Sequence, residues 1–320
     1  MRVLPAIVYV GIALMLAGAV YGQETLQPQK VAPGVYAFVG EPGDISVANR
    51  GFVGNSGFIV GRSGVVVIDT GSSYRHGRRM LEAIARTTDK PVQLVILTHA
   101  VQEFLFGSAA FDEIGIPILA HRETAKLMQA RCDHCLARLK AVLGAELEGT
   151  RLVLPRRLID ATTDLDTGGR RFQLIHLGWT STPGDLAVFD AESRVLFAGG
   201  MVSTDSIPDI RDCDFEGWQR GLRQLAQLHP AHVVPGHGPV SDAGAITQTA
   251  AYLDALDSVV NALYAQSSSL MESVERATLP AYRNWAMYGS THRQNALHRY
   301  LQLELQELGA DPRSTAMPER

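Results

Sequence analysis

The sequence lacks an excess of charge of either sign, since 29 Lys and Arg stand against 33 Asp and Glu, for a formal net charge of −4. This balance offers no attraction for nucleic acid or for an acidic membrane surface. It also lacks internal repeats, low-complexity tracts and any apolar run of membrane-spanning length beyond one near the N-terminus. What is present, 46% hydrophobic and 19% charged residues over 320 positions, describes an ordinary folded chain and excludes disorder.

The first 22 residues have the pattern of a secretory signal peptide. Arg2 supplies a positive start, residues 3–20 form an uncharged apolar run, and Tyr21-Gly22 precede a cleavage point. The alternative is an uncleaved N-terminal membrane anchor facing the periplasm. Either way we expect a periplasmic or secreted protein with no other membrane contact. Residues 23–33 are polar and contain prolines, which predicts a mobile lead-in.

Apolar runs bounded by glycine alternate with helical patterns along the middle of the chain, which favours an α/β (α+β) fold with two mixed sheets covered by helices. Strands are expected at residues 34–40, 57–61, 65–68, 91–97, 116–120, 151–154, 157–160, 172–177, 186–190, 194–198 and 232–234, and helices at 74–87, 122–143 and 215–228. Residues 242–309 repeat apolar positions at helical spacing and predict a C-terminal helical extension. Residues 310–320 predict a flexible tail.

One stretch carries a specific motif. LVILTHAVQEFLFGSAAF, from Leu94 to Phe111, is a buried-strand pattern that ends in Thr98-His99 and turns into a short helix. It resembles the metal-binding centre of the metallo-β-lactamase superfamily, whose signature reads T-H-x-H-x-D-H-x-x-G. Short turns that also match the family lie at residues 67–71, 182–185 and 235–238. The resemblance implies an αββα four-layer sandwich over residues 34–241.

Active members of that superfamily hold one or two zinc ions, and bound zinc lowers the pKa of water to about 7. By resemblance, Asp69 matches the family's aspartate and is the candidate catalytic residue. His99 and His237 match the first and last ligand histidines, and Glu103 stands where a ligand aspartate belongs. The other ligand positions hold replacements: Val101, Phe104 and Ser181 in place of histidines, and Gly200 in place of the bridging aspartate.

This degenerate motif argues against the usual dinuclear zinc centre, because a catalytic zinc needs about three protein ligands. Two alternatives remain for the surviving residues. Either no metal binds and the histidines fill space and hydrogen-bond the backbone, or one non-standard zinc or iron ion is held by His99, Glu103 and His237. Val101 and Phe104 indicate that the metal cavity is partly filled by apolar atoms.

The cysteines offer a separate candidate site. Cys132 and Cys135 lie three apart on a predicted helix and therefore share a face, and Cys213 stands alone. A disulfide between the pair is the leading interpretation in an oxidising compartment. A redox pair, or a metal site of thiolates that also uses Cys213, is the second, and unpaired structural thiols are the third.

Within the superfamily, the chain resembles a secreted branch found with quinoprotein and sulfur-oxidation systems. The matching segments are Ala48-Asn49-Arg50-Gly51-Phe52, Tyr74-Arg75-His76-Gly77-Arg78, Gly217-Trp218, and Leu279-Pro280-Ala281-Tyr282 together with Asn295 and Tyr300. This resemblance implies an accessory role near periplasmic oxidation chemistry.

Three functions follow as hypotheses. The first is a catalytically impaired periplasmic accessory, a pseudoenzyme whose cleft holds a small-molecule ligand or a periplasmic protein partner. The second is an active hydrolase of an ester, thioester or lactam with one non-standard metal ion. The third is a thiol redox or metal-handling accessory that acts through Cys132 and Cys135.

Overall fold

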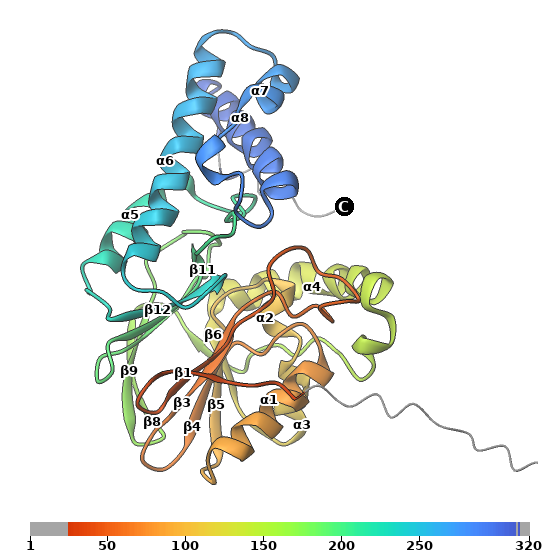
Figure 1. The fold of residues 1–320 in the computed structure, drawn as a ribbon, viewed down its shortest axis with the longest axis vertical. Helices are drawn as coiled ribbons and strands as arrows, with labels where there is room; N and C mark the ends of the chain where they lie inside the picture. Colours follow the sequence, from red (N-terminus) through yellow and green to blue (C-terminus); the bar gives the residue numbers. More distant parts are fainter. Residues whose placement is uncertain (1–24, 312, 314–320) are drawn as a thin grey trace, which may run out of the picture.

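The computed structural model describes residues 25–311 and 313, so the predicted signal peptide and most of the predicted tail lie outside the described residues. Two sheets face each other and helices cover both outer sides (Figure 1), which confirms the αββα sandwich. The first sheet runs in chain order: β1 (Gln29–Ala32), β2 (Val35–Phe38), β3 (Ser56–Val60), β4 (Val65–Ile68), β5 (Val92–Ile96), β6 (Ile118–His121) and β7 (Arg157–Ile159). The second has the order β12 (His232–His237), β11 (Val195–Ser203), β10 (Ala187–Asp190), β9 (Arg170–Ile175) and β8 (Thr163–Thr167).

The helices divide between the two sheets. Those beside the first sheet are α1 (Tyr74–Thr87), α2 (Gln102–Leu105), α3 (Ser108–Glu113) and α4 (Arg122–Leu143), and those beside the second are α5 (Phe215–Ala226) and α6 (Gly244–Ala265). The chain then continues through α7 (Leu270–Arg276), a π-helix at Tyr288–His292 and α8 (Arg293–Glu307). The expected bounds of α1 and α4 are confirmed.

Strand β4 explains why the layers form. All four of its residues are buried, and they divide by alternation. Val65 and Val67 pack with Met80 of α1 under the helices, whereas Val66 and Ile68 pack between the two sheets. A strand covered on both faces needs an unbroken apolar run, and Val-Val-Val-Ile supplies it.

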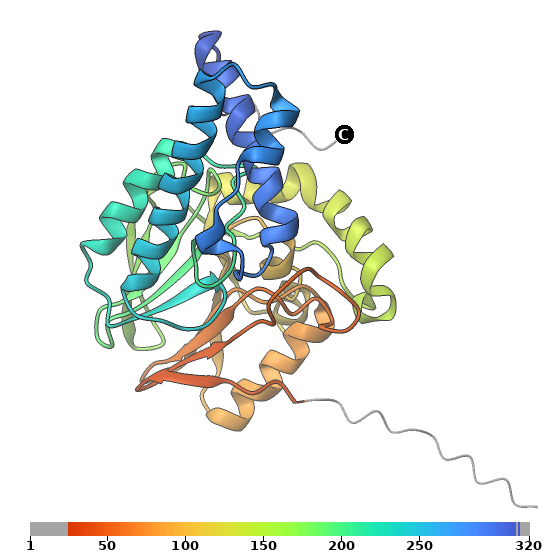
Figure 2. The same cartoon turned by 45° about the horizontal axis from the view of Figure 1, so that its top comes forward.

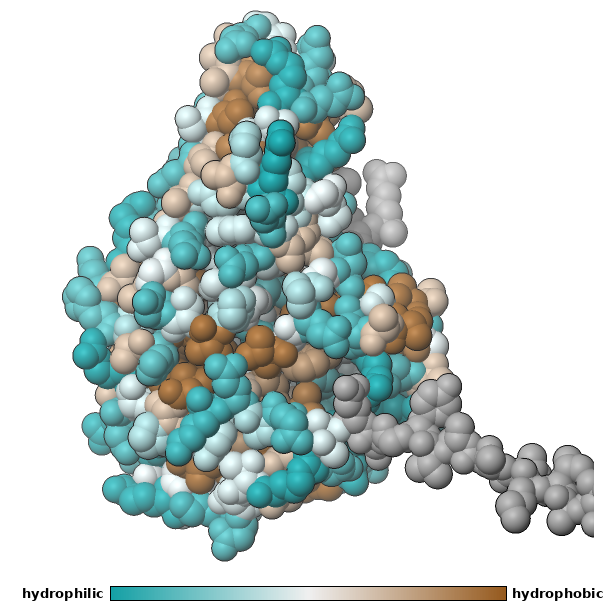
Figure 3. Space-filling model, viewed as in Figure 1, coloured by the Kyte–Doolittle hydropathy of each residue, from teal (hydrophilic) through white to brown (hydrophobic). Residues whose placement is uncertain are grey.

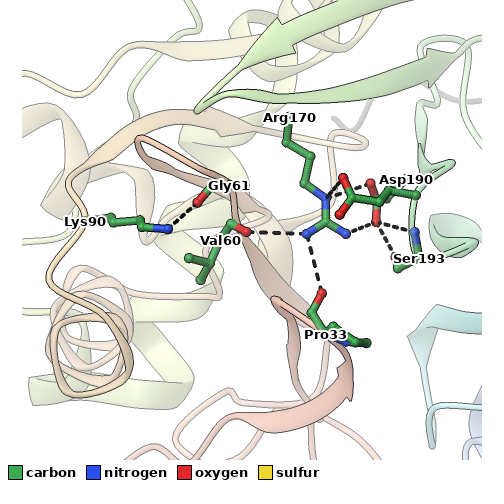
Figure 4. A network of polar contacts seen from close by, with 8 residues as sticks. Pro33, Val60, Gly61, Lys90, Arg170, Asp190 and Ser193 are labelled. Atoms are coloured by element: carbon green, nitrogen blue, oxygen red, sulfur yellow. Dashed lines mark hydrogen bonds and ion pairs between the residues drawn. The ribbon is translucent and has the colours of Figure 1, made fainter.

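A buried ion pair links the two sheets (Figure 4). Arg170 of β9 donates from Nε to Oδ1 of Asp190, at the end of β10, over 2.9 Å. Its Nη1 lies 3.4 Å from the carbonyl oxygens of Pro33 and Val60 in the first sheet. The side chains are 6% and 0% exposed, so each charge depends on the other for compensation.

Three local expectations were wrong. Residues 29–32 of the expected lead-in form strand β1, which pairs antiparallel with β2, because the edge of β2 offers unpaired backbone groups. The strand expected at residues 151–154 is absent from the described structure. Val153 is buried and Leu152 partly buried by packing against the helical side of the first sheet, without strand pairing. Strand β8 was missed because TDLDT is charged at alternate positions and lies at a sheet edge.

The C-terminal helices pack onto the second sheet. Tyr252 of α6 and Tyr300 of α8 share one hydrophobic cluster with Trp218 of α5 and Leu196 of β11, and Figure 2 shows these helices rising beside that sheet. No helix within the described residues combines the length and the apolar character needed to cross a membrane. On the face drawn in Figure 3, apolar residues form small groups among hydrophilic ones.

Candidate functional site

The sequence-predicted site residues meet at one cavity of about 440 Å³. Strands β4 and β5 are parallel neighbours, as are β11 and β12. Because the carboxyl ends of parallel strands lie at the same sheet edge, the loops that follow them converge. The cavity is lined by His99, Val101, Glu103, Ser181, Gly200 and His237. Asp69 and Phe104 are buried behind this lining.

Asp69 positions His99 through Thr98. Its Oδ1 accepts from the Thr98 backbone N–H at 2.8 Å and its Oδ2 from Thr98 Oγ1 at 2.7 Å, and Thr98 Oγ1 lies 2.7 Å from His99 Nδ1. Burial raises the pKa of Asp69 to about 7, although both bonds from Thr98 lower it. The structure therefore gives Asp69, our candidate catalytic residue, contacts that position Thr98 and the His99 ring.

Ser181 and Gly200 stand beside His99. A Cβ placed on Gly200 would lie 2.8 Å from Ser181 Oγ and 3.0 Å from His99 Nε2. Ser181 Oγ donates to Asp185 Oδ2 at 2.8 Å, and Thr182 donates to the same carboxylate from its backbone N–H and its hydroxyl. In the family that this chain resembles, this turn carries a ligand histidine. Here the turn is held by hydroxyl groups.

Phe104 contacts both histidines of the site. Its ring is fully buried, with its centroid 4.3 Å from that of His99 and 5.3 Å from that of His237. Nε2 of His237 lies 3.2 Å from Oε1 of Glu103. Burial alone would raise the pKa of Glu103, but the hydrogen bond and charge of His237 lower it below its usual value. Burial lowers the pKa of His99 to about 4.

The donor set does not fit the zinc centre that the resemblance implies. Glu103 and His237 lie together, and the apolar Phe104 ring packs against both His99 and His237. Among residues 25–311 and 313, no group of three or more His, Cys, Asp or Glu side chains is arranged to hold a metal ion. The predicted ligands His99, Glu103 and His237 therefore share a cavity without converging on one point.

The cysteines are divided between different environments. Cys132 lies on the buried face of α4, in the core of the first sheet, while Cys135 of the same helix lines the cavity. Cys213 is buried in the core of the second sheet, where burial strongly raises the pKa of its thiol. All three are thiols in the described structure, so the disulfide expected between Cys132 and Cys135 is not formed in it. Cys213 lies in a different core from Cys132, so the structure does not bring it together with Cys132 and Cys135 in one site.

Sequence reasoning missed one whole wall of the cavity, which comes from the C-terminal extension. Met287, Ser290, Thr291 and Gln294 line it from this side. Asn295, fully buried, accepts from the Ile210 backbone N–H at 3.2 Å and donates to the Pro208 carbonyl at 2.7 Å. This holds the extension against the loop at residues 206–212, and a helical repeat pattern alone could not reveal that contact.

Arginines on the cavity wall were missed as well. Arg131 of α4 pairs with Asp212 at 2.8 Å, and Arg211 pairs with Asp209 at 2.8 Å. All four residues line the cavity. Because each guanidinium faces a carboxylate, these pairs add little net charge to the cavity.

The chain matches the sequence model of the Metallo-beta-lactamase superfamily over residues 49–237. Curated proteins that resemble it include a linear primary-alkylsulfatase of Pseudomonas sp. (23% identical; 56% of this chain, 40% of that protein). A 2,4-dinitroanisole O-demethylase subunit alpha of Nocardioides sp. is 28% identical and covers 56% of this chain. The chain spans only 40% and 51% of the lengths of these two relatives.

Shorter proteins resemble it over more of their length. A Metallo-beta-lactamase type 2 of Bacillus sp. is 22% identical over 64% of this chain and 75% of its own length. Among solved structures, a metallo-beta-lactamase from Pontibacter korlensis has a TM-score of 0.59 at 22% identity, and the match covers 72% of this chain and 99% of that one. At this identity the likeness shows the fold alone. The family match ends at residue 237, before the extension that lines the cavity.

Proposed function

Since the chain belongs to the metallo-beta-lactamase superfamily but carries Phe104, Ser181 and Gly200 at ligand positions, we propose that it is a catalytically impaired member. Its function is then to bind a small organic ligand in the cleft. The observation that carries this proposal is the Phe104 ring, which is fully buried and packs against both His99 and His237. A hydrocarbon ring there occupies space beside the two histidines and donates no electron pair to a metal ion.

The cavity itself supports ligand binding. Its volume of about 440 Å³ lies within the range of small-molecule sites. More than half of the residues that line it are polar or charged, and apolar side chains such as Val101, Leu127 and Met287 lie among them. Polar groups of this kind can orient an organic molecule while the apolar side chains contact its body.

We also propose that the protein is exported and serves an accessory role near periplasmic oxidation chemistry. The support comes from the sequence of residues 1–22, which has a positive start and an apolar run, and from the short matches to the secreted branch. N-terminal sequencing of the full-length chain from fractionated cells would test export, with a mature N-terminus near residue 23 expected. An intact N-terminus in the cytoplasmic fraction would contradict it.

The rival function is hydrolysis with one non-standard metal ion. Two observations favour it: Glu103 and His237 remain together, and two of the relatives are named as a sulfatase and a lactamase. The thiol hypothesis has less support, because Cys132 and Cys213 are buried in different cores.

Metal analysis of protein purified without chelators tests the proposal against its rival. We expect well below one equivalent of zinc or iron per chain. We also expect no chelator-sensitive hydrolysis of ester, thioester or lactam substrates. One bound zinc or iron ion per chain together with chelator-sensitive turnover would refute the impaired-enzyme proposal. Thiol titration with and without reductant tests the redox alternative on the same sample.

A further inference from the structure

Three buried hydroxyl groups lie along one wall of the cavity. Ser203 ends β11, Ser206 belongs to the loop that follows this strand, and Thr291 lies in the π-helix of the extension. These residues are 3%, 6% and 8% exposed, and all three line the cavity. We call them the hydroxyl wall.

Backbone contacts hold the hydroxyl wall together. Ser203 and Ser206 are only three residues apart in the chain. Ser206 forms a β-bridge with Ala286 of the extension, and the N–H of Thr291 donates to the carbonyl of Met287, the residue after Ala286, at 2.8 Å. The extension is therefore joined to the loop after β11 at the point where the three hydroxyl groups lie.

The hydroxyl groups of this wall have hydrogen-bonding capacity that the protein does not use. Within residues 25–311 and 313, no group hydrogen-bonds to Oγ of Ser203, Oγ of Ser206 or Oγ1 of Thr291. Oγ1 of Thr204 also has no partner there, but it is sealed inside the protein, whereas the three hydroxyl groups of the wall are open to the cavity. A hydroxyl group can donate one hydrogen bond and accept two. The wall therefore offers donors and acceptors side by side.

The charges around the cavity favour an uncharged ligand. Among the described residues that line it, four carboxylates stand against three guanidinium groups. Three of these carboxylates already face an arginine or the His237 ring. Most charge is thus compensated within the protein, and an anion would meet a small excess of negative charge. Uncharged hydrogen-bonding groups remain for a ligand to use.

A ligand must replace the hydrogen bonds that these hydroxyl groups make with water in solution. The hydroxyl groups of a polyol can both donate and accept, as water does, whereas an alkyl or aryl group can do neither. The carbon skeleton of a polyol can at the same time contact Val101 and Met287, which also line the cavity.

We propose that the cavity binds a small uncharged polyol, such as a monosaccharide or a cyclitol, whose hydroxyl groups hydrogen-bond to Ser203, Ser206 and Thr291. This inference rests on the proposed ligand-binding function and names the chemical class of the ligand.

The test compares three probes built on the same carbon ring: myo-inositol, cyclohexanol and myo-inositol 1-phosphate, each titrated into the full-length protein by calorimetry in the presence of EDTA. We expect myo-inositol to bind about tenfold more tightly than cyclohexanol or better, since each added neutral hydrogen bond contributes roughly two- to tenfold. The phosphate should bind more weakly than myo-inositol, because carboxylates outnumber guanidinium groups in the described lining.

Two variants locate the site. Ser203→Ala removes a hydroxyl group that bonds no described group of the protein, so it should leave the free energy of unfolding unchanged and weaken myo-inositol binding about fivefold. Thr291→Val removes a hydroxyl group from the extension at nearly constant side-chain volume and should have the same effect, so either variant can decide if the other does not fold. Cyclohexanol binding should change little in both.

Ser273→Ala is the matched control. The Ser273 hydroxyl is also buried without a partner, but Ser273 belongs to α7 and is not among the residues that line the cavity. Its removal should leave myo-inositol binding unchanged.

Equal or tighter binding of cyclohexanol or of the phosphate, no binding of myo-inositol, or unchanged myo-inositol affinity in both wall variants would each overturn the inference. The metal content of the same preparation, measured before EDTA is added, separates this failure from failure of the proposed function. A metal-free protein that prefers cyclohexanol keeps its ligand-binding role and loses only the polyol, whereas a stoichiometric zinc or iron ion with chelator-sensitive turnover removes both.

Discussion

Phe104 gives the sharpest prediction, because it tests whether a hydrocarbon ring has replaced a metal ligand. Phe104→His supplies an imidazole beside Glu103 and His237, which already lie 3.2 Å apart, and so completes three ligands. The ring of Phe104 is 0% exposed, and Phe→Ala at such positions costs about 3–5 kcal/mol. An imidazole keeps part of that volume but buries polar atoms, so we expect a loss of about 2 kcal/mol in the free energy of unfolding without metal.

Zinc should reverse that loss. At a zinc concentration 100 times the Kd, binding to the folded state adds about 2.7 kcal/mol. Urea unfolding with and without zinc measures the difference, and Phe104→Leu is the matched control, since it removes the ring without adding a ligand. Zinc should stabilise Phe104→His and leave the wild type and Phe104→Leu unchanged. Equal stabilisation of the wild type by zinc would refute the reasoning, because Phe104 would then not prevent metal binding.

Three further substitutions test individual contacts. Arg170→Met leaves the buried Asp190 carboxylate without its cation and should cost about 3–5 kcal/mol in urea unfolding, most of which Asp190→Leu should restore in the double variant. Burial lowers the pKa of His76 to about 3, so its neutral form stabilises the fold above pH 6.5 and that contribution is lost as the pH falls toward 3. His76→Phe should therefore remove about 2 kcal/mol of the stability difference between pH 7 and pH 5, and an unchanged difference would contradict the assignment. Asn295→Ala should cost about 2 kcal/mol and accelerate amide hydrogen exchange at Ile210, whose N–H it leaves without an acceptor; unchanged exchange there would argue against the contact.

Most strands could be predicted because a strand covered on both faces has a strong sequence pattern. β4 is apolar along its length and β5 is apolar at every position except Gln93, so the positions of both strands could be read from the sequence. The edge strands β1 and β8 could not be predicted this way. Their residues are half-exposed or charged, and what holds them in strand form is the unpaired backbone of a neighbour that lies elsewhere in the chain.

The candidate site shows the same division. Its residue list could be written from the motifs alone, and His99, Glu103, Ser181, Gly200 and His237 do line one cavity. The mutual geometry of these side chains could not be predicted, because it depends on how β11 lies against the turn after β5. The contribution of the extension was also hidden, since helical spacing in a sequence does not say which face of which sheet a helix will meet.

The amino-acid sequence by itself determined the family, because the match depends on residue types at fixed spacing within local turns. Only the tertiary structure decided how the side chains of the candidate site are arranged. The Phe104 ring packs against both His99 and His237, and the C-terminal extension supplies one wall of the cavity. Both are contacts between segments distant in the chain, which form only when the two sheets pack face to face.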